Sequence, residues 1–576
     1  MSCDGTPPAR RGLLVAACCL ALLALGPVFD TNDDPAMIAL LTRAGGGTAF
    51  GPTYLGSPLS AALLSLYAAW PALPWYGLVM ESCNVVSAAL WAALIASCPV
   101  RPALRLAATA GLLVGYGYLV LRVNFMAVSL SLFLAGTAWF WKLQIERRAL
   151  RWRQGWLGAA LGLGYMIRPS LQLLLLFFAL PCLVVSLGTR NLRRLLLVGV
   201  PAAAMILATA AGDHQRLEMP GALALATFNK ARSLLVDIPR DPTPAALAAA
   251  GWSRGDYEMA VRFGMYDGEL YPVGRIRAFL AQAGRAPWVE RYARTARDYL
   301  LGRFHLLCLA TLLCVVWLLG TGTGGAGGAN RPPAAIRALV WGWVAAGTLA
   351  LIANRFPPRV FVPLYLYLGA LAILVPPPLP RFSLGRRASG PARLVALGAV
   401  AALLCFSMAF WLADARAGRA RLEADARDLA AGVAAAGPDA ILVPVGQLLE
   451  TQYAGALTPA KFPVRSLMAP AGWVVATPAL GDFLARAGFA SGHAFMRGLV
   501  LDRRMVFVVR RSRQDDAQWL VERLNERYAP GERLGIEPLD APAGGSGFLF
   551  FRVRGTPGQA RSLWYNPPAE GRGILS

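Results

Sequence analysis

The feature that most constrains the fold is a series of apolar stretches, each of about the length that a helix needs to cross a lipid bilayer. The chain has 576 residues, of which 56% are hydrophobic, and its mean hydropathy is +0.49. This composition is too apolar for a soluble globule and predicts an α-helical polytopic membrane protein. About eleven crossings are expected, at roughly 12–29, 76–98, 105–121, 125–141, 155–168, 169–187, 195–211, 303–320, 336–353, 360–377 and 394–412.

The basic residues predict the orientation of these spans. The net charge is +24, but arginine and lysine gather in short connections, as expected for signals that hold a loop in the cytoplasm. With a cytoplasmic N-terminus, every cluster falls inside: residues 101–105, 142–153, 190–194, 331–337 and 381–393. This distribution argues against a nucleic-acid partner. The first apolar stretch lacks a clear small-x-small cleavage pattern and is expected to stay as an uncleaved helix.

Three regions are then expected outside the membrane on the non-cytoplasmic side. They are residues 30–75 (the first loop), residues 212–302 (the second loop) and residues 413–576. Within the first loop, Pro58–Trp70 is apolar but only about 13 residues long, so we expect a helix that lies along the membrane surface. The expected domains are therefore residues 1–412 in the membrane and a C-terminal domain at residues 413–576.

The C-terminal domain is expected to be a small α/β unit. Short apolar segments predict strands at Ala440–Val445, Met505–Val509 and Gly547–Val553. Helical periodicity predicts helices at Arg419–Ala436 and Asp516–Tyr528.

Cysteine and histidine give no sign of a disulfide framework or a metal site. All nine cysteines lie in or beside apolar segments, and they form no zinc motif. The three histidines are far apart in the sequence, so a histidine-based metal centre is not expected.

The first loop opens with an acidic cluster, Phe29-Asp30-Thr31-Asn32-Asp33-Asp34. A charged group at a membrane boundary is costly unless it faces water, an ion or a polar substrate. One explanation is a helix start, in which Asn32 or Asp34 caps the helix and Pro35 takes its first position. The other is a rigid turn that presents Asp33 or Asp34 to a substrate. The local residues leave both explanations open.

The loop continues in an ordered series, with Gly45-Gly46-Gly47, Gly51-Pro52 and Tyr54-Leu55-Gly56-Ser57-Pro58 before the apolar helix. Here the chain resembles the GT-C class of polytopic glycosyltransferases, in particular bacterial members with an Asn-Asp-Asp-x-x-Met first outer loop, which is Asn32-Asp33-Asp34-Pro35-Ala36-Met37 in this sequence. The likeness extends to Gly251-Trp252-Ser253 with Asp256-Tyr257 and Asp267, and to Arg355-Phe356-Pro357-Pro358-Arg359-Val360.

The resemblance implies an activity and a place for it. Members of the class take a sugar from a polyprenyl phosphate or pyrophosphate at the outer face of the membrane, with inversion at the anomeric carbon, and pass it to a glycan, lipid or protein acceptor. Here the face would be that of a bacterial cytoplasmic membrane. The essential acid of the first loop maps to Asp33 or Asp34, with Asp30 as a helper. This chain has Asp-Asp where many relatives have Asp-Glu or Glu-Asp, which leaves the identity of the key carboxylate open.

The chemistry explains why a carboxylate is needed. A lipid phosphate is a good leaving group, so one aspartate that accepts the proton of the acceptor hydroxyl could suffice. The same carboxylate, Asp33 or Asp34, could instead hold a divalent cation, Mg²⁺ or Mn²⁺, against the phosphate. No cofactor is fixed by the residues themselves.

Four arginines map to the outer boundary, where orientation signals do not explain them. A guanidinium there can bind a lipid phosphate, or it can pair with a loop carboxylate or reach toward lipid headgroups. The second explanation is favoured for Arg122, and phosphate binding is narrowly favoured for Arg168, which interrupts an apolar run. For Arg355 and Arg359, the two explanations are equally favoured.

The second loop places Asp256 and Asp267 beside Trp252 and Tyr257. Acids beside aromatic rings suit sugar binding, although such aromatics also form small cores or membrane anchors. Two other functions remain as alternatives: a flippase or exporter of lipid-linked glycans, and a polysaccharide polymerase. The acidic cluster at the boundary and the lack of visible repeats favour the transferase.

Overall fold

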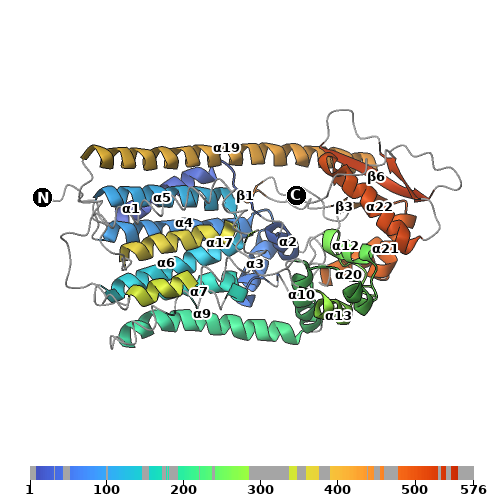
Figure 1. Ribbon diagram of the computed structural model, residues 1–576, viewed down its shortest axis with the longest axis horizontal. Coiled ribbons are helices and arrows are strands. Elements are labelled where there is room, and N and C mark those ends of the chain that lie inside the picture. Colours follow the sequence, from blue (N-terminus) through green and yellow to red (C-terminus); the bar gives the residue numbers. More distant parts are fainter. Residues whose placement is uncertain are drawn as a thin grey trace.

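The computed structural model describes about two thirds of the chain as a helical bundle that continues into a small sheet (Figure 1). The described residues are 8–30, 33–42, 52, 54–98, 102–145, 155–171, 177, 180, 192–219, 221–236, 240–284, 293, 337–346, 358–374, 390–437, 439–445, 455–458, 478–529, 534–539 and 547–555.

Most of the expected spans coincide with helices of the bundle. These are α1 (Pro8–Leu23), α4 (Trp75–Ser97), α5 (Pro102–Leu121), α6 (Phe125–Ile145), α7 (Trp156–Ile167), α9 (Leu192–Glu218), α17 (Pro358–Leu374) and the first half of α19 (Gly390–Ala436). The first helix ends six residues before the expected boundary at residue 29. It ends early because Gly26 turns the chain at a φ of 74°, which glycine adopts without strain.

Three described helices are long and apolar enough to cross a membrane: Trp75–Ser97, Phe125–Leu143 and Leu196–Glu218. The expected span at 303–320 lies outside the described residues. Of the spans at 169–187 and 336–353, the structure describes only parts, including a helical segment over residues 337–346.

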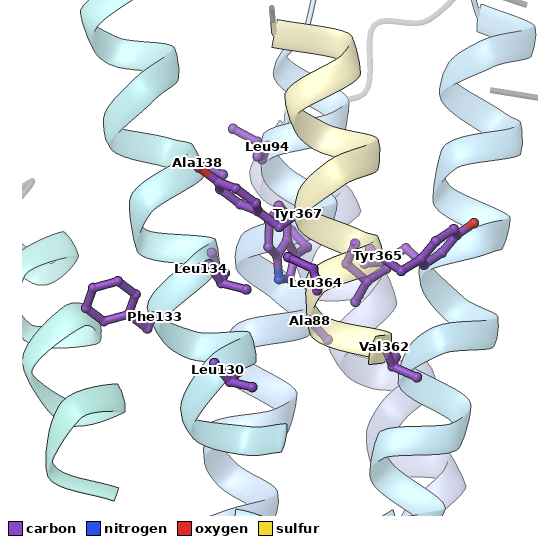
Figure 2. Close-up of a cluster of buried hydrophobic side chains, with 14 of the residues drawn as sticks. Ala88, Leu94, Leu130, Phe133, Leu134, Ala138, Val362, Leu364, Tyr365 and Tyr367 are labelled. Atoms are coloured by element: carbon purple, nitrogen blue, oxygen red, sulfur yellow. The ribbon is translucent and has the colours of Figure 1, made fainter. Parts of the chain in front are cut away.

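The core of the bundle lies between α4, α6 and α17 (Figure 2). Its buried side chains are mainly aliphatic, and the largest of them are Trp91, Trp141, Tyr367 and, from the neighbouring α5, Tyr116. Apolar side chains on three helices meet here because each helix carries them around most of its circumference, as is typical of helices in the middle of a bundle.

Short helices lie at the end of the bundle that faces the sheet (Figure 1). The first loop forms α2 (Asp33–Leu41) and α3 (Ser57–Ala69), which agrees with the helix expected at Pro58–Trp70. The second loop forms α10 (Ala222–Val236), α11 (Pro244–Ala250), α12 (Arg254–Arg262) and α13 (Val273–Gln282). A separate apolar cluster packs these second-loop helices around Trp252 and Phe279.

The C-terminal region forms a four-stranded sheet in the order β3-β4-β6-β5. The strands are β3 (Ile441–Val445), β4 (Met505–Arg510), β5 (Leu534–Pro538) and β6 (Phe548–Gly555); β3 and β4 are parallel, and the other pairs are antiparallel. Helices α20 (Pro478–Ala487), α21 (Gly492–Leu501) and α22 (Gln514–Tyr528) accompany it. Three strands and the last helix agree with the sequence predictions, and β5 was not expected.

Helix α19 joins the two parts of the molecule. It runs unbroken for 47 residues, along the bundle and on to the sheet (Figure 1). The expected helix at Arg419–Ala436 is its final part, and the expected division at residue 412 therefore falls inside one continuous helix.

Candidate functional site

A short pair of strands fixes where the first loop begins. β1 (Val28–Phe29) runs parallel to β2 (Arg122–Val123), which follows directly after α5. The backbone N–H of Asp30 donates to the carbonyl of Val123 at 2.9 Å. The acidic cluster is thereby held at the end of α5, beside the start of α6.

Asp33 and Asp34 form the first turn of α2, where the helix dipole favours negative charge. Asp34 is 0% exposed. Its Oδ1 accepts hydrogen bonds from the Tyr76 hydroxyl at 2.7 Å and from the Phe125 N–H at 3.2 Å. It therefore fastens α2 to the starts of α4 and α6. Asp33 is only half-buried and is the more accessible of the two carboxylates.

Asp30 and Arg122 lie beside one another at the strand pair. Asp30 is half-buried, and its Oδ1 accepts from the Tyr118 hydroxyl at 3.4 Å. Arg122 forms an ion pair with Asp414 of α19. Two explanations other than phosphate binding were favoured together for Arg122, lipid headgroups and a loop carboxylate; the structure shows a carboxylate partner, which lies on helix α19 and not in a loop.

Arg168 ends α7 and lies against two aromatic rings. Its guanidinium carbon is 4.2 Å from the ring centre of Tyr54 and 5.1 Å from that of Phe125. Phe125 also donates its N–H to Asp34, so Arg168 and Asp34 flank one residue. Arg168 is over 130 positions from Asp34 in the sequence, and the structure brings it to the acidic cluster. The two rings hold the guanidinium in place through cation–π contacts.

The two remaining arginines are less fully described. Arg355 lies outside the described residues, and Arg359 lies in the first turn of α17, with its side chain outside the description. Their expected role in phosphate binding stays a prediction.

Arg216 was not expected at this site, yet it holds the first loop in place. It donates to the carbonyls of Pro52 at 3.0 Å and Leu55 at 3.1 Å and pairs with Asp213 at 3.0 Å. Asp213 in turn accepts from both the N–H and the hydroxyl of Ser57. A charged Asp-x-x-Arg pair directly after an apolar span was the available signal.

The C-terminal region also contributes to the core beneath the first loop. The Ala456 N–H donates to the carbonyl of Pro27 at 2.6 Å, and Ala456 is buried in one cluster with Phe29 and Tyr76. Gly77 permits this approach, since a Cβ there would lie 1.8 Å from the Ala456 carbonyl oxygen. Nothing in the sequence analysis indicated this insertion.

Asp256 and Asp267 lie elsewhere, where the second loop meets the C-terminal domain. Asp256 forms a capping box with Ser253 at the start of α12, and its Oδ1 lies 3.9 Å from Nε of Arg527 on α22. Asp267 is buried and accepts from the Leu270 N–H, the Tyr528 hydroxyl at 2.8 Å and His493 Nδ1 at 2.8 Å. Both acids thus have partners that bind the two units together.

The environment of Asp267 favours its charged form. Burial alone would raise its pKa, but the hydrogen bonds from His493, Tyr528 and Leu270 outweigh burial and lower the pKa below its ordinary value. Burial, with the nearby charge of Asp267, raises the pKa of Tyr528, so that its hydroxyl stays protonated and donates. The protonated Tyr528 hydroxyl can therefore donate to the charged Asp267 carboxylate over the ordinary pH range.

The described residues include no group of three or more His, Cys, Asp or Glu side chains that could hold a metal ion. In the described part of the first loop, Asp33 is the half-exposed carboxylate at the start of α2 that could contribute to a cation site. Asp34 Oδ1 already accepts two hydrogen bonds.

No protein-family model matches this sequence, and no curated protein and no solved structure matches it at a significant level. The function is therefore inferred from the site's own residues.

Proposed function

We propose that this protein is a GT-C-type membrane glycosyltransferase that moves a sugar from a polyprenyl-phosphate-linked donor to a glycan, lipid or protein acceptor. The observation that carries the proposal is the arrangement of Asp33, Asp34 and Arg168 around the starts of α2 and α6. An accessible acid and a cation lie within one small region there, as transfer from a lipid phosphate requires. The Asn-Asp-Asp-x-x-Met resemblance supports the same activity.

Within this proposal the two neighbouring aspartates have different roles. Asp33 is half-buried, so its carboxylate can meet a substrate. Asp34 is fully buried and holds Tyr76 and the backbone of Phe125. We therefore assign the catalytic role to Asp33 and a positioning role to Asp34.

The reaction is a single displacement. The acceptor hydroxyl oxygen forms a bond to the anomeric carbon of the sugar as the bond from that carbon to the phosphate oxygen breaks. Asp33 takes the hydroxyl proton, and the lipid phosphate leaves with the electron pair of the broken bond. Arg168 stabilises the phosphate charge. Where a divalent cation takes part, Asp33 would help to hold it, and it would supply the same charge stabilisation.

We propose that the helical bundle spans a bacterial cytoplasmic membrane with the first loop, the second loop and the C-terminal domain on the outer side. Three helices of suitable length and the clustering of basic residues in the expected inner connections support this orientation. A tag placed after Ser576 should then react with a membrane-impermeant reagent in intact spheroplasts. Labelling only after lysis would contradict the orientation.

The test compares glycans and glycolipids, by mass spectrometry, from cells that lack the protein and cells that carry the wild type, Asp33→Asn or Asp34→Asn. We expect the wild type to add a product one sugar heavier. Asp33→Asn should lower its amount by about 10²-fold or more, the usual contribution of a general base, while expression and thermal unfolding stay unchanged. Asp34→Asn should lower the unfolding temperature as well as the product.

The matched control is Asp515→Asn, which changes an exposed aspartate in the first turn of α22. It should leave the product unchanged. Full product with Asp33→Asn would exclude the catalytic role of Asp33, and identical glycans with and without the wild-type protein would exclude the transferase itself.

One observation favours a second candidate, a flippase or exporter of lipid-linked glycans. Glu81 is buried within α4, a candidate span, and accepts a hydrogen bond from Asn84 at 3.1 Å. Ionisable groups inside spans are typical of transport paths. A flippase would leave the glycan linkages unchanged, would be insensitive to Asp33→Asn, and would lose translocation with Glu81→Gln.

A further inference from the structure

A cavity of about 190 Å³ lies between α12 of the second loop and α22 of the C-terminal domain. The α12 side contributes Ser253 and Asp256, the α22 side contributes Arg523, Glu526 and Arg527, and Tyr271 lines it from the loop before α13. None of the acids of the first loop lines this cavity. It is therefore separate from the candidate catalytic region.

The walls of the cavity are fixed from both sides. The capping box between Ser253 and Asp256 sets the start of α12, and the Tyr271 hydroxyl donates to the Asp256 carbonyl at 2.8 Å. Gly255 lets the two helices approach, since a Cβ there would lie 3.1 Å from Cδ of Arg523 and from Oε2 of Glu526. Walls that are already ordered lower the entropic cost of binding a ligand.

Hydrogen-bonding groups in the cavity remain available. Within the described part of the chain, Arg527 makes no hydrogen bond; its contact is the ion pair with Asp256 at 3.9 Å, and its side chain is 47% exposed. Arg523 is already engaged: its Nη1 donates to both carboxylate oxygens of Glu526, at 2.8 and 2.6 Å, and its buried Nε lies 3.9 Å from Oε2 of Glu258. The groups that a ligand can reach are Arg527, which can donate, and Glu526, which can accept and has a side chain that is 57% exposed.

The charges in the cavity select the kind of ligand. Two guanidinium groups face two carboxylates, Asp256 and Glu526, so the lining has no net charge. A phosphate would be repelled by the two carboxylates, and a cation would be repelled by the two arginines. A neutral polyhydroxyl compound can accept a hydrogen bond from Arg527 and donate one to Glu526.

The volume limits the size of the ligand. It is smaller than the ~300 Å³ at which pockets for drug-sized ligands begin. We propose that this cavity binds one neutral sugar unit of a glycan through Arg527 and Glu526. The proposal goes beyond the transferase activity, because it concerns sugar binding at a separate place. Its test measures this binding directly and requires no sugar transfer.

The experiment measures saturation-transfer NMR on the full-length protein in a detergent without a sugar headgroup. The probes are methyl α-D-glucopyranoside, methyl α-D-mannopyranoside and methyl β-D-galactopyranoside. We expect at least one probe to receive saturation from the wild type. Arg527→Gln, which removes a charged donor, and Gly255→Val, which fills the space between the helices, should each weaken that binding about tenfold, the effect of ~1.4 kcal/mol.

Two controls keep the result specific. Arg513→Gln changes an exposed arginine just before α22 that does not line the cavity, and it should bind like the wild type. Asp33→Asn should also bind normally, even where it abolishes transfer, so a failure of the transferase proposal and a failure of this one are distinguishable. The proposal is overturned if no methyl glycoside binds, if both cavity variants bind as the wild type does, or if inorganic phosphate displaces the probe.

Discussion

At the scale of single residues, two adjacent aspartates with the same chemistry are placed in different environments. Asp34 turns into the protein and receives two hydrogen bonds, whereas Asp33 stays half-exposed. A buried carboxylate is tolerated only while its hydrogen bonds are made. The position of Asp33 therefore depends on the partners of Asp34.

The first prediction concerns the Tyr76 hydroxyl, which donates to Asp34 at 2.7 Å. Tyr76→Phe keeps the ring but leaves the buried carboxylate with one donor fewer. We expect the free energy of unfolding to fall by about 1–3 kcal/mol, the usual cost of a lost partner at a buried polar group. Thermal unfolding of the purified protein, followed by intrinsic fluorescence, measures the change.

The matched control is Tyr266→Phe. Tyr266 is 2% exposed, and its hydroxyl has no hydrogen-bond partner among the described residues. Removing that hydroxyl should leave stability unchanged or raise it slightly. An equal loss in both variants would show that the hydrogen bond to Asp34 does not matter.

Part of the candidate site could be predicted from the sequence. The acidic cluster and Arg168 were identified because charged groups in or beside apolar spans are unusual. The sequence could not tell which aspartate is buried, because Tyr76 and Phe125 lie 42 and 91 positions from Asp34. Arg216 and Ala456 were missed for the same reason, since each acts on a first loop that is distant in sequence.

At the scale of elements, the junction between the second loop and the C-terminal domain depends on a close approach at Gly492. This residue opens α21, and a Cβ there would lie 1.8 Å from the carbonyl oxygen of Tyr266. We predict that Gly492→Ala forces the two units apart at this point. Overpacking of this kind typically costs about 1–3 kcal/mol. Limited proteolysis should then cut the second loop faster than in the wild type.

Gly481→Ala is the matched control, because Gly481 lies within α20 and has no atom within 4 Å of the position of an added Cβ. Alanine is the better helix former by about 0.5–1 kcal/mol, so this variant should be at least as stable as the wild type. If Gly492→Ala resists proteolysis equally well, the approach at Gly492 is not needed for the junction.

The elements themselves were predictable to different degrees. Three strands of the sheet follow from continuous apolar runs, whereas β5 carries Gly535 and ends at Pro538, both of which disfavour strands. The continuity of α19 was hidden by a change from apolar to charged residues near residue 412. Composition changes there because the surroundings of the helix change, while the backbone continues unbroken.

At the scale of the whole molecule, the described residues attach the C-terminal domain to the rest of the chain at three places. Helix α19 pairs Asp414 with Arg122 and brings Arg419 within 3.2 Å of the Leu25 carbonyl. Ala456 inserts beneath the first loop, and Asp267 binds His493 and Tyr528. The third attachment includes Asp267, whose charged form is held by hydrogen bonds, so the position of the domain over the second loop should respond to pH without any change in the bundle.

The last prediction is that response. Because the pKa of folded Asp267 lies below its ordinary value of 3.8, its carboxylate stabilises the junction fully above that pH, and this contribution is lost as the pH falls through the lower folded value. Hydrogen exchange at the backbone amides of α21 and α22 should accelerate in that acidic range, while amides of α4 and α6 stay protected.

Asp267→Asn should exchange faster already at pH 7, by an amount that corresponds to about 1.5–3 kcal/mol for hydrogen bonds to a charged group, and should lose the acid response. Asp515→Asn should behave as the wild type does. An acid response that persists in Asp267→Asn would assign it to another group.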